Sequence, residues 1–353
     1  MDPRLLKYYN RELQHVREMG GEFAKEFPKI AGRLGLDSFE CADPYVERLL
    51  EGFAFMSART QLKVDAEFPR FTQHLLDIVY PHFLAPTPSM AVVQFHPDLK
   101  EGTLNEGFTI PRQTSLRSQI GKGEQTASEY RTAHEVKLWP LQLIDAEYLA
   151  GAGAVANLGA PVLPGVKAGI RLRLQTTAGL KFNQIALNEL PLYLRGVGEM
   201  PMRIYEQFMA NAVAVVVQPV QRPVAWQKVI KRSPVSPLGF SPKQALLPFV
   251  DRSFQGYRLI QEYFAFPERY MFVELKNLQE SMRECGDNEI DIIVLFDRSN
   301  PQLINSVDAT RFALFCTPVI NLFPKRADRI HLNNQLPEYH IIPDRTRPMD
   351  YEI

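Results

Sequence analysis

Aromatic residues are concentrated in the segment from Phe254 to Phe272, which reads Phe-Gln-Gly-Tyr-Arg-Leu-Ile-Gln-Glu-Tyr-Phe-Ala-Phe-Pro-Glu-Arg-Tyr-Met-Phe. Its apolar residues recur at helical spacing, which predicts a helix that is apolar over most of its girth and leaves Arg258, Gln261 and Glu262 for water. Pro267 has no amide donor, so we expect the helix to end at Phe266 and a strand to follow over residues 270–275. We interpret this aromatic segment as a domain core; alternatively, part of it faces another subunit, since aromatic side chains also anchor interfaces.

The length and composition of the chain describe an ordinary globular protein. A chain of 353 residues exceeds the size at which single cores stop growing, so two or more domains are expected. The 40 basic residues balance the 40 acidic ones, which favours neither nucleic acid nor an anionic membrane as a partner. No apolar run could span a bilayer, and residues 1–4 open a polar helix and not a signal peptide, which predicts a cytoplasmic protein without membrane insertion. Cys41, Cys285 and Cys316 lie far apart, so we expect reduced, buried thiols.

The first 88 residues carry three helical patterns. Asp2 and Pro3 can start a helix that runs to about Phe27, Asp43 and Pro44 start a second, and a third is expected around residues 71–80. Their apolar seams are too narrow for an isolated globule of this size, so we expect them to pack against helices of other chains; the alternative is a closed intramolecular bundle. The predicted partner interface, including two residues of the aromatic segment, comprises Leu13, Val16, Phe23, Phe53, Met56, Tyr263 and Phe266.

The pattern changes to strands beyond the stiff segment Pro86-Thr87-Pro88, where we place a domain boundary. Alternating or apolar runs over residues 90–95, 169–176 and 289–296 predict strands, and helical patterns are rarer. We therefore predict an α+β protein, with an N-terminal helical bundle segment over residues 1–88 and a β-rich region with a few short helices over residues 89–353. The β-rich region contains one domain or two subdomains.

Patterns that could carry chemistry are few. Residues 151–156 fit the dinucleotide-binding fingerprint after a possible strand, but Pro161 and Pro164 follow too soon for the required helix, and we interpret the motif as a loop of small residues. The seven histidines are dispersed, and none forms a metal-binding pair at i and i+4. Glu289 and Asp291 share one strand face, which we interpret as a solvated face and not as a catalytic carboxylate pair. We expect no catalytic residue, no metal site and no cofactor, and hence no enzyme.

Five short segments have to be considered together. They are Asp43–Glu51 (DPYVERLLE), Tyr80–His82 (YPH), Leu192–Gly196 (LYLRG), Tyr257–Glu268 (YRLIQEYFAFPE) and Phe315–Phe323 (FCTPVINLF). Together and in this order they resemble the TssF family, also called ImpG or VasA, whose members are baseplate subunits of type VI secretion systems. The resemblance covers essentially the whole chain. Members of that family normally continue further, so the resemblance implies that a native C-terminal region is absent from this chain.

The resemblance implies a structural role without catalysis. TssF is similar to wedge proteins of contractile phage baseplates, and its implied partners are TssG, a second TssF copy, TssE, TssK and the spike hub. The assembled wedges would form the platform for tube and sheath assembly, docked at the inner-membrane secretion complex. The alternative is a baseplate protein of a contractile phage or phage-like particle.

Overall fold

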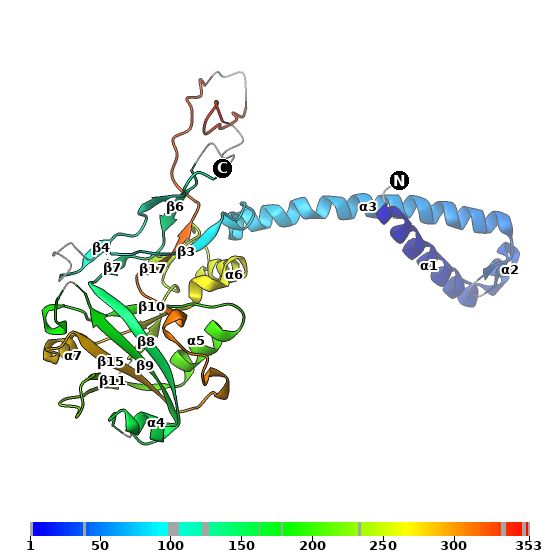
Figure 1. Cartoon of the computed structure of the whole chain (residues 1–353). Coiled ribbons are helices and arrows are strands. Elements are labelled where there is room, and N and C mark those ends of the chain that lie inside the picture. Colours follow the sequence, from blue (N-terminus) through cyan, green and yellow to red (C-terminus); the bar gives the residue numbers. More distant parts are fainter. Residues whose placement is uncertain are drawn as a thin grey trace. The chain divides into compact units, whose positions relative to one another are not determined.

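The computed structural model describes residues 3–37, 40–97, 106–121, 127–161, 163–177, 179–231, 234–332, 337–347 and 351. The chain forms two compact units, Met1–Ala85 and Pro86–Ile353, and the division falls at the stiff segment where a domain boundary is expected from the sequence. The first unit is helical and the second is built from antiparallel sheets with short helices (Figure 1), so the predicted α+β class is confirmed.

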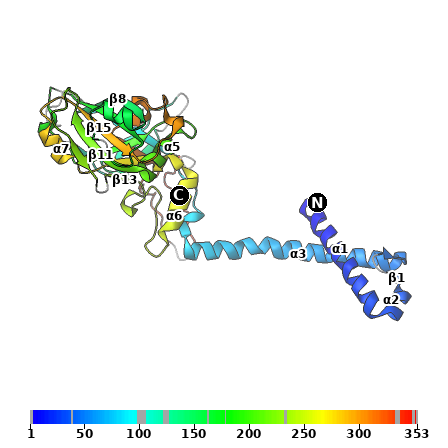
Figure 2. The same cartoon turned by 90° about the horizontal axis from the view of Figure 1, so that it is seen from below.

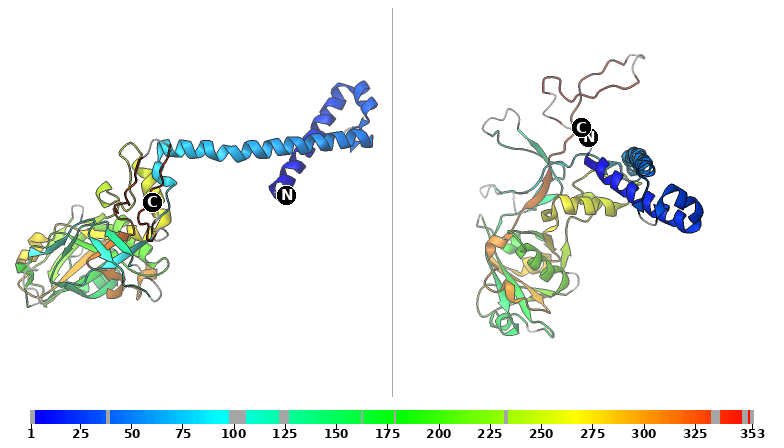
Figure 3. Two further views of the ribbon diagram at one scale, coloured as in Figure 1. Left: turned by 90° about the horizontal axis from the view of Figure 1, so that it is seen from above. Right: turned by 90° about the vertical axis from the view of Figure 1, so that its right-hand side faces the viewer.

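The first unit is a helical hairpin. Its long helices are α1 (Pro3–Glu26) and α3 (Pro44–Val79), and between them lie α2 (Pro28–Leu34) and a small antiparallel ribbon of β1 (Leu36–Asp37) and β2 (Glu40–Cys41). Gly35 ends α2 in the left-handed conformation with a φ of 64°, which a glycine adopts without a steric penalty. A 3-10 turn, η1 (Pro81–Phe83), follows α3. The connection through α2 and the ribbon lets α1 fold back against α3 (Figure 3).

A single helix of 36 residues, α3, spans the region for which two separate helices are expected from the sequence, so that expectation is wrong. The helix starts as expected, with Pro44 in its first turn and the Asp43 carboxylate accepting a hydrogen bond of 2.9 Å from the Tyr45 amide. Pro69 lies inside the helix and removes one backbone donor, yet α3 continues through it as an unbroken ribbon (Figure 2).

The cap at Asp43 gives a first testable prediction. Asp43→Ala removes the acceptor for an otherwise unsatisfied amide, so we expect it to lower the free energy of unfolding of the first unit by about 1 kcal/mol. Urea unfolding, monitored by the helical signal in circular dichroism, measures this loss. Asp43→Asn keeps an acceptor at the same position and should remain close to the wild type. Equal losses in both variants would show that the cap does not stabilise α3.

The second unit contains four antiparallel sheets within its described residues. The largest has the strand order β12-β11-β15-β9-β8, two others have the orders β13-β14-β10-β16 and β3-β17-β6-β5, and β4 pairs with β7. The strands are β3 (Met90–Gln94), β4 (Phe108–Ile110), β5 (Ser115–Arg117), β6 (Glu129–Thr132), β7 (Val136–Leu138), β8 (Leu141–Ala150), β9 (Ala168–Thr176), β10 (Leu190–Leu194), β11 (Ala212–Pro219), β12 (Lys228–Ile230), β13 (Val235–Pro237), β14 (Phe272–Leu275), β15 (Glu289–Phe296), β16 (Phe312–Ala313) and β17 (Cys316–Ile320). The strands predicted over residues 90–95, 169–176 and 289–296 are confirmed as β3, β9 and β15.

Short helices connect and cover these sheets. They are α4 (Ala152–Asn157), α5 (Met200–Ala210), α6 (Gln255–Ala265) and α7 (Gln279–Glu284), with the 3-10 turns η3 (Phe182–Gln184), η4 (Pro242–Gln244), η5 (Pro267–Tyr270), η6 (Pro301–Leu303) and η7 (Ala309–Arg311). Phe208 of α5 packs edge-on against Phe296 of β15, with ring centroids 5.8 Å apart. The predicted helix end at Phe266 is confirmed, and the strand after it begins at Phe272 because η5 takes up residues 267–270.

The core of the second unit lies on both faces of the five-stranded sheet. On one face, alternate residues of β15 such as Ile292 and Val294 join the main apolar cluster, whereas Ile293 and Leu295 join a smaller cluster on the other face. Asp291 in the same strand is fully buried and accepts two hydrogen bonds from Arg173 of β9, at 2.8 and 3.1 Å. The expectation of a solvated carboxylate face is therefore wrong for Asp291, because a cross-strand arginine satisfies its charge.

Candidate interface surfaces

The outer face of α6 is an exposed aromatic surface. Phe254 is 70% exposed, Ile260 59% and Phe264 81%, and Tyr257 and Tyr263 are also exposed. These residues follow one another at helical spacing, so their side chains form one continuous strip along the helix. We call these five residues the α6 strip. The interpretation of this part of the segment as a domain core is wrong, because its largest side chains face solvent in this chain.

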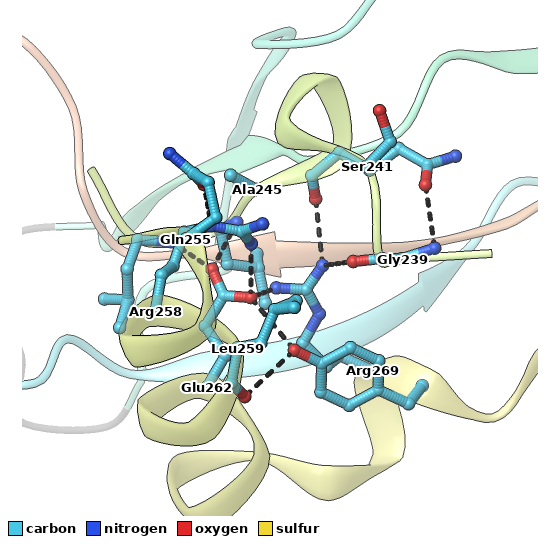
Figure 4. Close-up of polar contacts among 12 residues, drawn as sticks. Gly239, Ser241, Ala245, Gln255, Arg258, Leu259, Glu262 and Arg269 are labelled. Carbon is cyan, nitrogen blue, oxygen red and sulfur yellow. Dashed lines mark hydrogen bonds and ion pairs between the residues drawn. The ribbon is translucent and has the colours of Figure 1, made fainter. Parts of the chain in front are cut away.

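The inner face of α6 is charged, which reverses the predicted orientation of the helix. Arg258 and Glu262, which the apolar pattern assigns to water, are 1% and 0% exposed. The Glu262 carboxylate accepts hydrogen bonds from the amides of Leu246 and Leu247 at 3.0 and 2.9 Å. It also forms ion pairs with Arg258, at 2.9 Å, and with Arg269 of η5 (Figure 4). Glu262 is thus the centre that attaches α6 to the rest of the unit.

Arg269 connects this centre to the neighbouring loop. Its Nη2 atom donates to the carbonyl oxygens of Gly239 and Gln244 at 2.6 and 3.0 Å (Figure 4). Burial lowers the pKa of Arg269 to about 10, and the nearby Arg258 and Arg112 act in the same direction. The guanidinium remains charged at neutral pH, so the buried carboxylate keeps its partners. The polar network orients α6, and the α6 strip is left uncovered.

A second exposed apolar surface lies along α3. Its residues follow one another at steps of three or four, as in the seam of a coiled coil, interrupted only by Thr60. They range from 46% exposed at Leu75 to 84% at Tyr45. We call this set the α3 row: Tyr45, Leu49, Phe53, Met56, Val64, Phe68, Phe71, Leu75 and Ile78.

Another side of α3 is covered by α1 of the same chain. Ala54 and Ala58 are fully buried, the Ser57 hydroxyl donates to Glu12 at 2.9 Å, and the Tyr8 hydroxyl donates to Asp65 at 2.7 Å. These pairs make α1 antiparallel to α3. Because α1 begins only five residues before Tyr8 and a helix rises 1.5 Å per residue, α1 is too short to cover the last turns of α3.

The structure places the seven predicted interface residues on four different parts of the chain. Leu13, Val16 and Phe23 of α1 are half-buried. Phe53 and Met56 belong to the α3 row and are 65% and 57% exposed, and Tyr263 belongs to the α6 strip. Phe266 is half-buried, where it packs against a small cluster that includes Leu246 and Leu247. A contact of any of these residues with a partner stays a prediction.

Sequence reasoning missed the second half of the α3 row, from Val64 to Ile78. The signal was present, because the steps of four and three continue from Val64 through Pro69 without a change of phase. Two separate helices were expected over this region, so the apolar spacing was not followed from one into the other. Sequence reasoning also missed the ion centre at Glu262, whose only local signal is an arginine four residues before a glutamate.

A cavity of about 550 Å³ lies in the second unit, next to the loop that Arg269 holds. His134 lines it and is only 5% exposed, and its ring meets Phe272 edge-on with centroids 5.3 Å apart. Burial, together with the positive charges of Arg269 and Arg112, lowers the pKa of His134 to about 3. Burial also raises the pKa of the Cys316 thiol on the cavity wall to about 12. Both groups are therefore neutral at physiological pH.

The low pKa of His134 predicts a pH-dependent stability. The unfolded chain binds a proton at this histidine near pH 6.5, whereas the folded chain does so only near pH 3, so stability falls as the pH drops through this window. We expect a loss of about 2 kcal/mol from this group between pH 8 and pH 5. Urea unfolding at both pH values measures it. The loss should be absent in His134→Asn and unchanged in His340→Asn, which alters an exposed histidine. The same pH dependence in His134→Asn and the wild type would contradict this assignment.

The structure also places the small-residue motif at residues 151–156 and the three cysteines. The strand expected before residues 151–156 is confirmed as β8, but the motif forms the short helix α4 and not the expected loop. Cys285 and Cys316 are buried free thiols, whereas Cys41 is only half-buried. Among the described residues, no group of three or more His, Cys, Asp or Glu side chains could hold a metal ion. No described helix is both long and apolar enough to cross a membrane.

Comparisons with known proteins identify relatives of the whole chain. A family model described as "Type VI secretion system, TssF" matches residues 1–353. The chain is 55% identical over 353 residues to the type VI secretion system component TssF1 of Pseudomonas aeruginosa PAO1, which covers 100% of this chain and 57% of that protein. It is also similar, with a TM-score of 0.66 and 27% identity, to a chain in a cryo-electron microscopy structure of the type VI secretion system TssK-TssF-TssG baseplate subcomplex. That match covers 85% of this chain and 54% of the other, so this chain spans little more than half the length of either relative.

Proposed function

The chain belongs to the TssF family of type VI secretion systems, and from this premise we propose that it is a structural subunit of the secretion baseplate. The observation that carries the proposal is the α3 row, an apolar seam with coiled-coil spacing that α1 leaves uncovered. Exposed apolar surfaces of this extent are typical of protein interfaces. Family membership supports a structural role and not a catalytic one.

We propose TssG and TssK as direct partners, because the similar solved structure contains a TssK-TssF-TssG subcomplex. A second TssF copy, TssE and the spike hub are further partners in this proposal. The assembled particle docks at the inner-membrane secretion complex and serves as the platform for tube and sheath assembly. Of the two surfaces, the α3 row has the spacing that suits partner helices, and the α6 strip offers aromatic anchors.

Co-expression with the TssG and TssK of the same genome tests this function. We expect one complex in size-exclusion chromatography, and we expect it to persist in about 1 M NaCl, because such salt screens exposed charges but does not weaken apolar contacts. A net charge of zero supports this expectation. Failure to form the complex would contradict the proposed function, whereas a complex that dissociates in salt would contradict the apolar mode of binding.

A further inference from the structure

The cavity beside His134 contains a buried polar atom without a partner. Among the described residues, none hydrogen-bonds to the Nε2 atom of His134. The backbone nevertheless fixes this residue, because the His134 amide donates to the Thr317 hydroxyl at 3.0 Å. Buried polar groups in folded proteins are almost always hydrogen-bonded, so an unsatisfied ring nitrogen in a residue that lines a cavity makes this cavity a candidate site for a polar ligand group.

The charges on the cavity wall indicate which ligand suits it. Its charged side chains are three cations and two carboxylates, so their sum is one positive charge: Arg112, Lys137, Lys243, Glu135 and Glu274. Two of these five side chains already have partners that do not line the cavity. Glu274 pairs with Lys276 at 3.1 Å, and the Arg112 guanidinium donates to the Ala245 carbonyl at 2.7 Å. One surplus positive charge complements a monoanion better than a phosphate dianion or a nucleotide.

The buried charges behind the wall add to this positive character. Arg258 and Arg269 share the single carboxylate of Glu262, and both of their charges act on Arg112 or His134. An anion in the cavity would reduce the repulsion among these cations. The positive potential therefore extends into the interior, and exposed lysines alone do not account for it.

The rest of the wall is apolar. It includes Leu190, Leu238, Phe272 and Phe315, together with Trp139, over whose ring the Lys137 ammonium lies at 4.4 Å. A volume of about 550 Å³ is within the usual range for small-ligand sites. We propose that this cavity binds a monocarboxylate carried on an apolar or aromatic body, with Lys243 facing the carboxylate and His134 hydrogen-bonding to it. The carboxylate belongs either to a small molecule or to the C-terminus of a peptide chain.

The fluorescence of Trp139 tests this proposal in the full chain. The sequence contains two tryptophans, so Trp226→Phe leaves Trp139 as the sole indole reporter. We expect a saturable change on addition of phenylacetate and none with phenylacetamide, which lacks the charge, or with inorganic phosphate. A peptide ending in phenylalanine with a free carboxylate should bind more tightly than phenylacetate if the source is a protein terminus, and more weakly if it is a small molecule. No response to either carboxylate, or an equal response to the amide, would overturn the proposal.

Matched variants locate the site. Lys243→Gln removes one wall cation and should weaken phenylacetate binding about tenfold, whereas Lys181→Gln changes an exposed lysine outside the wall and should leave it unchanged. His134→Asn should weaken binding too, with the fold checked by circular dichroism. Because Lys243 is exposed, its variant remains informative if His134→Asn fails to fold. Equal affinity in Lys243→Gln and the wild type would place the ligand elsewhere and refute the assignment.

Discussion

Aspartate at both Phe53 and Phe71 is expected to abolish the association of this chain with TssG while the chain stays folded. Both side chains belong to the α3 row and are 65% and 58% exposed, so the substitutions remove little packing within the chain. In a covered seam, each phenylalanine contributes about 2 kcal/mol of apolar burial, and each aspartate adds a desolvation cost. The sum of about 4 kcal/mol or more corresponds to at least a thousandfold increase in Kd.

A matched double variant on another side of the same helix separates seam contacts from general damage to α3. Arg59→Asp with Gln73→Asp introduces the same number of aspartates at exposed positions outside the α3 row. We expect it to bind TssG nearly as well as the wild type, as measured by co-purification and by titration calorimetry. Circular dichroism checks that both double variants keep their helical content. Retained binding in the seam variant would remove the α3 row from the interface.

Glu262→Ala is expected to destabilise the second unit by about 3–5 kcal/mol, a large part of the stability of an ordinary domain. The substitution leaves the buried guanidinium groups of Arg258 and Arg269 without their shared carboxylate. It also removes the acceptor for the amides of Leu246 and Leu247. Urea unfolding, followed by fluorescence or by near-ultraviolet circular dichroism, measures the loss.

Two comparison variants show which part of the Glu262 centre matters. Glu262→Gln keeps an oxygen that can accept from the amides but removes the charge, so its loss should lie between those of the wild type and Glu262→Ala. Glu268→Ala removes an exposed carboxylate from the same segment and should change the stability by less than about 0.5 kcal/mol. A loss below about 1 kcal/mol in Glu262→Ala would show that the ion centre does not hold α6 in place.

The α6 segment shows where sequence reasoning succeeds and where it fails. The end of the helix before Pro267 and the strand after it depend on local backbone chemistry, and both could be predicted. The orientation of the helix could not. Periodicity alone assigns the aromatic face to the interior. In the structure, the buried amides of Leu246 and Leu247 and the guanidinium of Arg269 instead take the Glu262 carboxylate as their partner. These partners come together only in the tertiary structure.

The first unit shows a different limit. The starts at Pro3 and Pro44 could be predicted because caps and prolines act locally. The continuation of α3 through Pro69 could not be predicted from the proline alone, since one missing hydrogen bond does not decide whether a helix ends. The unchanged apolar spacing on both sides of Pro69 was the better signal, because one seam can be covered only if the helix is continuous.

Hydrogen–deuterium exchange of α3, with and without TssG, tests most directly whether a partner covers the α3 row. The last turns of α3 lie beyond α1, so their amides should exchange readily in the free chain and at least about tenfold more slowly in the complex. The Phe53→Asp and Phe71→Asp double variant should lose this protection. Unchanged exchange over residues 64–78 in a complex that does form would show that TssG does not cover this part of the α3 row.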